Sequence, residues 1–355
     1  MKTVKIKFVD MPKHIDAGSL GEVNRIEQIF VRALEKYYKV ELSEQPDYIF
    51  CFLPIPGCDG VEYAKYPNAV RIQVAQESVR PEFNVFDYCI GMFPDIKCDR
   101  YFYLPSSLLC NESVRSSYEQ MRIKHLNIDL QKACARDFCS FVVSNANGAP
   151  ERGAFLEVAN SYKRVDSGGG YRNNIGYRVQ NKIEFEAKHK FSIAFENCYY
   201  SCVTEKINMS FAAKTVPIYW GNPDVGKMYN EKAFINCHNF DDFEAVLDYV
   251  KKIDNDDSLY THMLKEPALL VDKSLKEYEN DLSFFLKNII EQPKKNAIIR
   301  TSVEWSGYME RIRYYGMKRH MRVMGFTFWL GTHTPKWMKK CHLGSIVKNT
   351  LFRKM

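Results

Sequence analysis

Short apolar runs alternate along the first part of the chain with segments whose apolar residues recur at helical spacing. Residues 2–9 alternate polar and apolar side chains, and the runs at 48–53, 69–74 and 86–91 are largely apolar. Residues 22–38 carry apolar side chains every three or four positions, the period of an amphipathic helix. Strands that alternate with helices in this way predict an α/β domain with a largely parallel sheet.

The same alternation continues in the second half of the chain. Apolar runs predict buried strands at 138–143, 191–195 and 215–220, and helical spacing predicts helices at 113–134, 152–159 and 203–213. A chain of 355 residues is longer than one hydrophobic core usually serves, so we expect two domains. We place an N-terminal α/β domain at 1–140, a C-terminal α/β domain at 141–290 and a tail at 291–355.

Residues 191–221 are predicted to form a βαβ unit, whose first loop opens at the carboxyl edge of a parallel sheet. The loop contains Glu196 and Asn197, and the helix begins near Thr204, Glu205 and Lys206. A helix N-terminus offers unpaired N–H groups and the positive end of a dipole, and Lys206 adds a formal charge. The segment therefore predicts a phosphate site. The alternative is that Thr204 only caps the helix and its charged neighbours are solvated.

Two other predicted loops carry candidate site residues. Arg152 stands at the start of the helix that follows strand 138–143, and its planar guanidinium can donate in parallel to two oxygens of a diphosphate. Glu77 falls in the loop after strand 69–74, at the edge where open α/β sheets place their ligands. The alternatives are an arginine that extends along the helix surface and a solvated loop carboxylate.

Three segments resemble the donor-binding signature of the α-1,3/4-fucosyltransferases, glycosyltransferase family 10, of bacterial type. They are Phe195-Glu-Asn, Val203-Thr-Glu-Lys and Val216-Pro-Ile-Tyr-Trp-Gly, and the resemblance extends from about Gln76 to Phe240. The family usually has tyrosine before Val-Thr-Glu-Lys, whereas this chain has Cys202. The resemblance implies an α/β, GT-B-like fold of two Rossmann-like domains facing a cleft, here with a basic C-terminal helical tail. It also implies GDP-fucose as the sugar donor.

The resemblance further implies roles for single residues. Glu77 matches the family's proposed catalytic base, and Arg152 matches an arginine that contacts phosphate. Lys206 completes the expected catalytic set. The residues expected to bind the sugar donor are Ser144, Asn145, Asn181, Lys182, Glu196, Asn197, Val203, Thr204 and Glu205.

No metal or other cofactor is expected. The eleven cysteines show no Cys-x-x-Cys pair and no Cys/His cluster at zinc spacing, which indicates reduced thiols. Asp254-Asn-Asp256 has the Asp-x-Asp form that some glycosyltransferases use to hold a metal, yet it stands between two helical segments. We predict a helix terminus there, and we expect fixed cations to meet the charge of the diphosphate.

Basic residues are concentrated in the tail. Residues 294–355 contain fourteen lysines and arginines and two glutamates, whereas the whole chain has a net charge of +7. Aromatic and apolar residues beside these charges predict a surface helix on anionic lipid, and a helix packed across the domain junction is the alternative. Nucleic-acid binding is not expected, because no recognised fold motif accompanies the charges.

The N-terminus has no apolar segment typical of a signal peptide, and no stretch reaches the ~20 apolar residues of a membrane span. We therefore expect a cytoplasmic protein, peripheral at the inner face of the cytoplasmic membrane.

Together with these features, the resemblance implies an inverting fucosyltransferase. Glu77 is expected to deprotonate an acceptor hydroxyl that attacks the anomeric carbon of fucose, while GDP leaves from the opposite face. The resemblance also implies the acceptor, a GlcNAc-containing glycan of the N-acetyllactosamine or Lewis type, modified at a 3- or 4-hydroxyl in the synthesis of a surface polysaccharide such as lipopolysaccharide. The alternatives are a transferase for another GDP-sugar and a non-catalytic, membrane-associated protein that binds nucleotide sugars.

Overall fold

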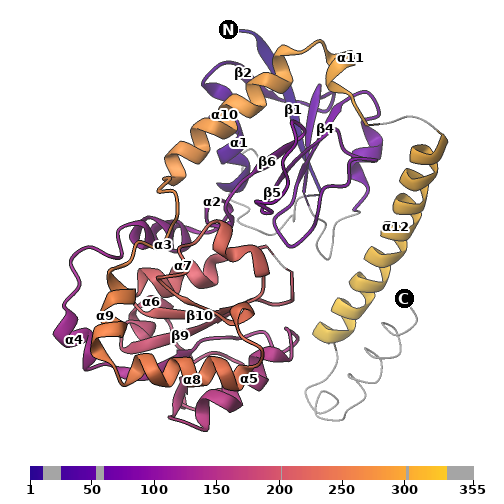
Figure 1. Cartoon of the computed structure of the whole chain (residues 1–355). Helices are drawn as coiled ribbons and strands as arrows, with labels where there is room; N and C mark the ends of the chain where they lie inside the picture. Colours follow the sequence, from indigo (N-terminus) through magenta and orange to yellow (C-terminus); the bar gives the residue numbers. More distant parts are fainter. Residues whose placement is uncertain (11–24, 53–59, 201, 301–303, 334–355) are drawn as a thin grey trace. The chain divides into compact units, whose positions relative to one another are not determined.

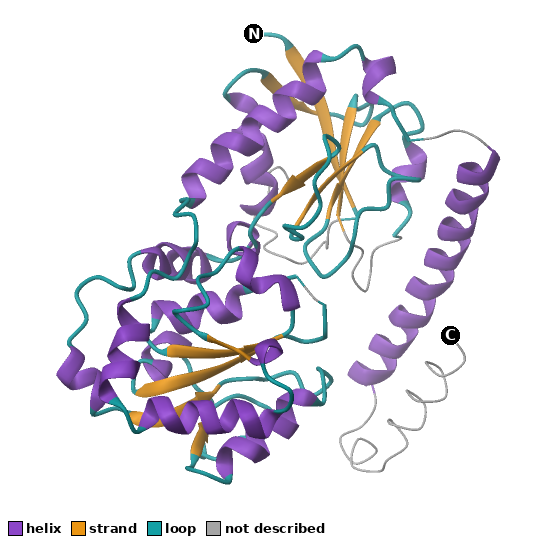
Figure 2. Cartoon of the chain, viewed as in Figure 1, coloured by secondary structure: helices purple, strands orange, loops and turns teal. Residues whose placement is uncertain are grey.

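The computed structural model describes residues 1–10, 25–52, 60–200, 202–300 and 304–333. The chain divides into two compact units. Unit 1 comprises Met1–Ile90, Arg100–Phe102 and Ser283–Met355, and unit 2 comprises Gly91–Asp99 and Tyr103–Leu282. Each unit contains its own β-sheet with helices packed on it (Figures 1 and 2). The predicted α/β class with two sheet-containing domains is confirmed.

The sheet of unit 1 has six strands in the order β2-β1-β3-β4-β5-β6. Neighbouring strands from β2 to β5 pair in parallel. Strands β3 and β4 are buried along their whole length, as expected for apolar runs in a parallel sheet covered on both faces. The strands are β1 (Thr3–Val9), β2 (Lys39–Leu42), β3 (Tyr48–Phe52), β4 (Val70–Val74), β5 (Tyr88–Gly91) and β6 (Tyr101–Tyr103).

One face of this sheet is covered by helix α1 (Arg25–Glu35). Phe30 of α1 lies close to the rings of Phe8, Phe50 and Phe52, with centroid distances of 5.0 to 6.4 Å. The helical spacing of apolar residues in α1 therefore places a narrow apolar stripe against the sheet. The remaining helices of this part of the chain are η1 (Glu62–Lys65), α10 (Leu275–Glu291), which begins in unit 2, and α11 (Lys294–Ala297).

The predicted tail does not form a unit of its own. Tyr314 and Met317 of helix α12 (Glu304–His333) pack against a buried cluster of unit 1. Arg313 pairs with Glu82, and Glu310 lies 2.7 Å from Nη1 of the buried Arg71. These contacts explain why residues 283–355 group with unit 1 instead of standing apart from 291 onwards.

Unit 2 contains a five-stranded sheet in the order β11-β10-β9-β7-β8, and every neighbouring pair is parallel. Read from β8, the order in the chain is 2-1-3-4-5, so the direction of winding reverses between β7 and β9. Ligands of such sheets bind outside the carboxyl ends of the strands at this switch point. The strands are β7 (Asp137–Phe141), β8 (Val165–Ser167), β9 (His189–Phe195), β10 (Val216–Trp220) and β11 (Ile235–Asn236).

Helices lie on both faces of the unit 2 sheet (Figure 2). Apolar residues of α5 (Glu151–Asn160), α8 (Phe243–Asp254) and α9 (Asp257–Lys265) join one core cluster with β7, β9 and β10. Helix α7 (Glu205–Ala212) contacts β9 and β10 and also packs on α3 (Glu112–Arg122). The other helices of unit 2 are α2 (Ser106–Leu109), α4 (Leu130–Cys134), α6 (Lys182–Glu186), η2 (Pro223–Lys227) and η3 (Cys237–Asn239).

The structure differs from the predicted boundary at residue 140, because α3 packs on α7 and therefore belongs with unit 2. The helix predicted at 113–134 is also two helices. The chain leaves the first after Arg122, takes a positive φ at Asn127, and begins the second where Asp129 accepts a hydrogen bond from Lys132 N. Polar local hydrogen bonds thus interrupt a segment whose composition favours a helix.

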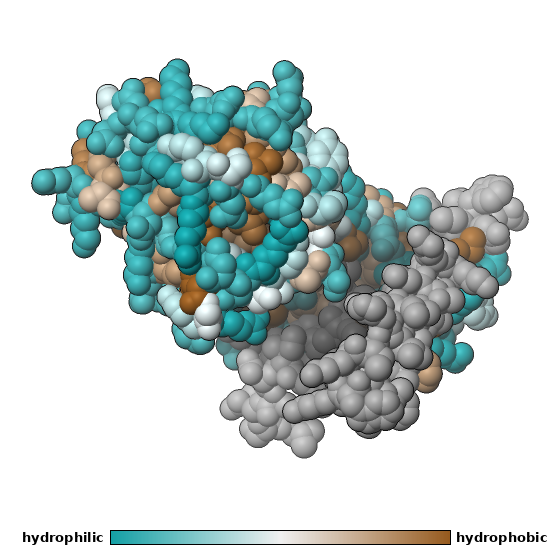
Figure 3. All heavy atoms as spheres, turned by 90° about the horizontal axis from the view of Figure 1, so that it is seen from below, coloured by the Kyte–Doolittle hydropathy of each residue, from teal (hydrophilic) through white to brown (hydrophobic). Residues whose placement is uncertain are grey.

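The visible surface of the molecule in Figure 3 is mostly hydrophilic, with hydrophobic side chains in smaller patches between the polar ones. This is the usual balance of a folded globular chain, in which apolar atoms still contribute to the surface. In the described part of the chain, no helix is both long enough and apolar enough to span a bilayer.

Candidate functional site

The candidate site of unit 2 lies at the carboxyl ends of β7 and β9, on either side of the switch point. The segment after β7 leads to Arg152 in the first turn of α5, and the segment after β9 begins with Glu196 and Asn197. A hydrogen bond from Ala149 N to the Asn197 carbonyl, at 2.7 Å, ties these two segments together. The topology therefore brings together residues that are more than forty positions apart in sequence.

Arg152 is almost fully buried at this edge, with 1% of its surface exposed. Its Nη2 donates to the Phe195 carbonyl at 2.9 Å and to Oδ1 of Asn197 at 2.5 Å. Among the described residues, Nε and Nη1 have no hydrogen-bond partner. Burial lowers the pKa of the guanidinium, and the carboxylate of Glu196 opposes that shift. Buried arginine N–H groups without acceptors are costly, so this side chain is suited to receive an anion.

Glu196 organises the start of α7 from inside the protein. It is fully buried, and both of its oxygens accept hydrogen bonds. Oε1 accepts from Thr204 N at 2.8 Å, and Oε2 accepts from Thr204 Oγ1 at 2.7 Å and from Lys206 Nζ at 3.1 Å. Since its oxygens are already engaged, Glu196 acts on the site by fixing Thr204 and Lys206.

Thr204 occupies the N-cap position of α7, yet its side chain accepts no hydrogen bond from a backbone N–H group of the first turn. Its hydroxyl instead donates to Glu196 and accepts from Lys206 Nζ at 2.9 Å. The simple capping role considered for Thr204 therefore does not describe its contacts.

Lys206 is held between two carboxylates. Its Nζ lies 3.1 Å from Glu196 Oε2 and 3.6 Å from Glu205 Oε1. Burial acts to lower the pKa of Lys206, but Glu196 and Glu205 raise it above its usual value. Burial likewise acts to raise the pKa of Glu205, yet Lys206 holds it below its usual value. Lys206 and Glu205 are therefore ionised near neutral pH, and the lysine charge is already balanced within the protein.

A glycine-rich segment after β8 approaches the loop after β7. A Cβ atom at Gly169 would lie 1.9 Å from the carbonyl oxygen of Val143, so only glycine fits there. Gly170 N donates to Ser144 Oγ at 3.2 Å. No strand was predicted here from the sequence, whereas the structure shows a short strand, β8, followed by a close backbone contact at the switch point.

The other residues expected to bind the sugar donor are distributed along unit 2. Ser144 and Asn145 are exposed in the segment after β7, and Val203 is buried just before α7. Asn181 caps α6 by accepting from Glu184 N at 3.3 Å, and Lys182 lies 3.5 Å from the buried Glu186. Direct contacts join six of the expected residues: Arg152, Glu196, Asn197, Thr204, Glu205 and Lys206. Asn181 and Lys182 make a hydrogen bond and an ion pair on α6, and the charge of Lys182 also acts to lower the pKa of Glu205.

An aromatic group at the same edge was not recognised from the sequence. His238 Nε2 accepts from Gly221 N at 3.1 Å, and burial lowers the pKa of its imidazole. The exposed ring of Tyr199 lies 5.8 Å from His238 and 6.0 Å from Trp220. The position before Val203, where the family usually has tyrosine, holds the buried Cys202.

Glu77 belongs to unit 1. It is exposed in the segment that follows β4, as predicted, and its carbonyl accepts from Val79 N at 2.6 Å. Glu82 follows in the same segment, where its N donates to Gln73 Oε1 at 3.0 Å and its carboxylate pairs with Arg313. Of these two acids, Glu82 therefore makes contacts that stabilise unit 1.

The Asp-x-Asp segment forms helix ends, as predicted. Asp254 ends α8 and lies 2.5 Å from Lys163 and 3.3 Å from Lys190, while Asp256 caps α9 by accepting from Ser258 N. Carboxylates engaged in this way are poorly placed to hold a metal. A different group, Asp137, Asp166 and His189, brings its ligand atoms within 4.8 Å of one another.

That group is explained by contacts within the protein. Asp166 accepts from Arg164 at 2.9 Å, and His189 Nδ1 contacts the Phe185 carbonyl at 3.0 Å. Asp137 and His189 stand at the starts of β7 and β9, at the opposite edge from Arg152 and Glu196. The cysteines among the described residues are not joined in disulfides.

Comparison with known proteins gives matches over both units. Residues 6–109 match the model of the "Alpha-(1,3)-fucosyltransferase FucT N-terminal domain", and residues 114–268 match that of "Glycosyltransferase family 10 (fucosyltransferase) C-term". The chain is 36% identical over 295 residues to the "Alpha-(1,3)-fucosyltransferase FucT" of Helicobacter pylori, with 73% of this chain and 61% of that protein aligned. The chain thus spans about three-fifths of the length of this relative.

Comparison with solved structures also gives fucosyltransferases. An α1,3-fucosyltransferase crystal structure superposes with a TM-score of 0.65 at 28% identity, covering 82% of this chain and 91% of the other. A crystal structure described as α1,3-fucosyltransferase with GDP-fucose superposes with a TM-score of 0.61 at the same identity and covers 92% of its chain. The matched sequence models and the shared fold agree over the whole candidate site, and the chain therefore belongs to glycosyltransferase family 10, the fucosyltransferase family.

Proposed function

We propose that this protein is an α-1,3-fucosyltransferase that uses GDP-fucose as its sugar donor. The observation that carries the proposal is the buried Arg152, whose Nε and Nη1 have no hydrogen-bond partner among the described residues. The identity of the sugar donor is inferred from the relatives named above, because one is an α-(1,3)-fucosyltransferase and another is described with GDP-fucose.

The diphosphate of the sugar donor would lie between Arg152 and the first turn of α7. Arg152 offers two unused donor nitrogens, and the side chain of Thr204 leaves the first-turn N–H groups of α7 uncapped. Asn197 fixes the guanidinium by accepting from Nη2. Fixed donors of this kind stabilise the charge that develops on a leaving diphosphate, so the proposal requires no metal or other cofactor.

Lys206 and Glu205 would have separate roles in donor binding. Because Glu196 and Glu205 already balance the charge of Lys206, the lysine contributes a positioned N–H donor more than an unopposed charge. The Glu205 carboxylate is ionised and would accept hydrogen bonds from ribose hydroxyls. Ser144, Asn145, Asn181, Lys182 and Val203 complete the proposed donor-binding set.

The transfer step would use Glu77 as base. Its carboxylate is exposed in the segment after β4, where it is accessible to an acceptor hydroxyl. After that hydroxyl loses its proton to Glu77, its oxygen bonds to the anomeric carbon of fucose and the bond to GDP breaks, so the configuration at that carbon is inverted. The proposed acceptor is a GlcNAc-containing glycan of the N-acetyllactosamine type, as in surface polysaccharides that carry Lewis-type structures.

The proposal extends to a membrane partner. Helix α12 uses Glu310, Arg313 and Met317 to contact unit 1, and it leaves Arg311, Tyr315, Arg319, Arg322 and Phe326 exposed. Exposed basic and aromatic residues on one helix favour the anionic inner leaflet of the cytoplasmic membrane. The test is co-sedimentation with vesicles that contain or lack phosphatidylglycerol. Equal binding to both kinds of vesicle would contradict the proposed lipid preference.

Isothermal titration with GDP-fucose, GDP-mannose and GDP, with and without chelator, tests the sugar donor. Selective binding of GDP-fucose that chelator does not change, followed by fucose transfer to N-acetyllactosamine, is the expected result. Equal binding of all three would favour a transferase for another GDP-sugar. Binding without transfer to any of a panel of acceptors would favour a non-catalytic protein that binds nucleotide sugars.

A further inference from the structure

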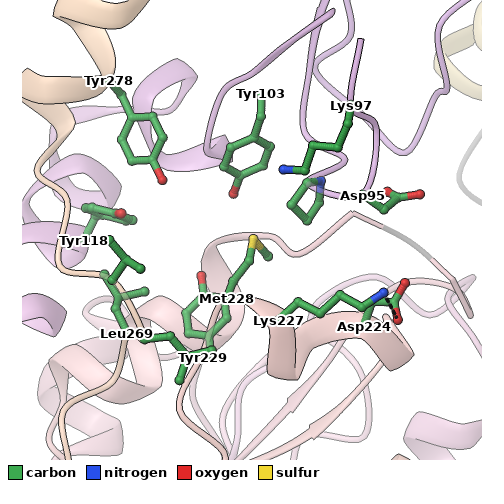
Figure 4. Close-up of a pocket in the computed structure, with 13 residues that line it drawn as sticks. Asp95, Lys97, Tyr103, Tyr118, Asp224, Lys227, Met228, Tyr229, Leu269 and Tyr278 are labelled. Carbon is green, nitrogen blue, oxygen red and sulfur yellow. Dashed lines mark ion pairs between the residues drawn. The ribbon is translucent and has the colours of Figure 1, made fainter.

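A second feature of unit 2 is a cavity of about 550 Å³ that contains none of the residues assigned to the sugar donor. Its walls come from the segment after β5, from α3, from η2 and the residues after it, and from the loop and first turns of α10 (Figure 4). The residues that line it include four tyrosines, two aspartates and two lysines: Tyr103, Tyr118, Tyr229, Tyr278, Asp95, Asp224, Lys97 and Lys227.

The polar ends of the tyrosines converge on this space. In Figure 4 the hydroxyl groups of Tyr103, Tyr229 and Tyr278 point into the cavity, and Lys97 extends toward Tyr103. Leu270 and Val271 are 56% and 75% exposed at the same cavity, so apolar surface remains accessible there. The cavity thus combines flat aromatic faces with hydroxyl, ammonium and carboxylate groups, and it carries no strong net charge.

We propose that this cavity binds a neutral sugar ring of the acceptor glycan, an assignment that rests on the function proposed above. A pyranose ring has an apolar C–H face and a rim of hydroxyls. Tyrosine offers a matching apolar face and a polar tip, and Asp and Lys side chains can accept from and donate to sugar hydroxyls. The volume is also within the usual range of small-ligand sites.

One residue of the cavity wall, Tyr229, contacts α7, the helix of the candidate donor site. Tyr229 OH donates to Asn208 Oδ1 at 2.6 Å, and Asn208 lies two residues after Lys206 on α7. The Tyr229 ring also lies nearly parallel to Phe211 of α7, with a centroid distance of 6.1 Å. An acceptor sugar in the cavity would therefore be anchored to the same helix whose first turn is expected to face the sugar donor.

The tyrosines are also held in place before any ligand binds. Tyr118 OH donates to the Lys273 carbonyl at 3.1 Å, and the rings of Tyr103 and Tyr278 meet edge to face at 6.0 Å. Burial raises the pKa of both Tyr118 and Tyr229, so their phenols stay protonated at neutral pH. Preformed walls reduce the entropy lost when a flexible sugar chain binds.

Two variants of the full-length protein test the proposal. Leu270→Trp fills the cavity from an exposed position, and Tyr278→Ala removes one aromatic wall. Tyr249→Ala is the matched control, because Tyr249 is an exposed tyrosine of unit 2 on α8 and does not line the cavity. For each protein we would measure the KM for N-acetyllactosamine, the Kd for GDP-fucose, and saturation-transfer NMR of N-acetyllactosamine alone.

Both cavity variants should raise the acceptor KM by about tenfold or more, the equivalent of losing one good contact, and weaken the NMR signal. Their GDP-fucose Kd should stay within about twofold of the parent, and Tyr249→Ala should change neither quantity. An unchanged acceptor KM in both cavity variants would overturn the sugar site. A parent that neither binds GDP-fucose nor transfers fucose would instead overturn the proposed function, and the NMR signal would still report whether the cavity binds the sugar.

Discussion

Lys206 Nζ donates to Oε2 of Glu196 at 3.1 Å, and that carboxylate is fully buried. The lysine expected to meet the phosphates of the sugar donor is therefore also the partner of a buried anion. Removing either group affects the fold as well as the site, because the remaining charge stays buried without its partner.

The first prediction concerns this pair. Lys206→Met should lower the free energy of unfolding by about 3–5 kcal/mol, the usual cost of breaking a buried ion pair, and should lower kcat/KM as well. Glu196→Gln should also lower the stability, because its amide NH2 group replaces an oxygen that accepts from Thr204 or Lys206, and it should lower the pKa of Lys206. Urea unfolding and the alkaline limb of the kcat/KM profile measure the two effects. A Lys206→Met protein as stable as the parent would contradict the buried pair.

Arg152 supplies the second prediction. Arg152→Ala and Arg152→Lys should each lower kcat/KM by roughly 10²–10³, the scale of losing one preorganised donor. Lysine should not rescue the activity, because its single ammonium group cannot bond to Phe195 and Asn197 and also face a diphosphate with a planar fork. Titration with GDP should show the same loss of affinity.

The matched control for Arg152 is Arg164→Lys. Arg164 is exposed in the same unit and pairs with Asp166, and we expect its replacement to leave GDP affinity unchanged. If a folded Arg152→Lys protein bound GDP as tightly as the parent, Arg152 would not be a diphosphate ligand.

Glu77 supplies the third prediction. Glu77→Gln should bind GDP-fucose with a Kd within about twofold of the parent and lower kcat by roughly 10²–10⁴, the usual contribution of a positioned general base. Titration and a radiometric transfer assay measure the two quantities. Glu41→Gln, an exposed acid on β2, is the control and should transfer normally. Full transfer by Glu77→Gln would remove Glu77 from the mechanism.

Gly169 supplies the fourth prediction. Gly169→Ala places a methyl group 1.9 Å from the Val143 carbonyl oxygen, and because both partners are backbone the segment has to move. We expect a loss of about 1–3 kcal/mol in stability, as for other overpacked positions, together with weaker GDP-fucose binding. Gly316→Ala on α12 meets no atom within 4 Å and should be tolerated. Equal melting temperatures for the two variants would contradict the close approach.

Most elements of both units could be predicted because their signals are local. Continuous apolar runs predicted β3, β4 and β9, and helical spacing predicted α1, α5 and α7. Strand β8 was missed because three residues beside a glycine-rich segment show no periodicity. Its strand character depends on its pairing with β7, which the sequence of β8 alone does not contain.

The residues of the candidate site also divide into those with a local signal in the sequence and those that depend on contacts between distant segments. Arg152 and Lys206 could be proposed because each stands where a predicted strand leads into a helix. The contacts of Glu196 could not, because they depend on which of several neighbouring charges the folded chain brings within hydrogen-bonding distance. The tyrosine cavity also could not be predicted, since its walls come from segments separated by more than 180 residues of sequence.

Lys124 supplies the last prediction, which concerns stability against pH. The side chain is fully buried, and Nζ donates to the carbonyls of Met263 and Leu264 at 3.1 and 3.0 Å. Burial lowers its pKa to about 7 from a usual value of 10.5. Between pH 7 and 10.5 the unfolded chain therefore binds a proton that the folded chain lacks, so this group makes the protein more stable as pH rises.

Lys124→Met removes that dependence. Relative to the parent, the variant should be most stable near pH 6, and its relative stability should fall by up to about 1.4 kcal/mol per pH unit between pH 7 and 10. Urea unfolding of both proteins at pH 6, 7.5 and 9 measures the difference, and other titrating groups cancel because the two chains share them. Lys132→Met, an exposed lysine of α4, should show a difference that does not change with pH. A constant difference for Lys124→Met as well would show that Lys124 keeps its proton in the folded protein, because the linkage requires a slope wherever the two states bind different numbers of protons.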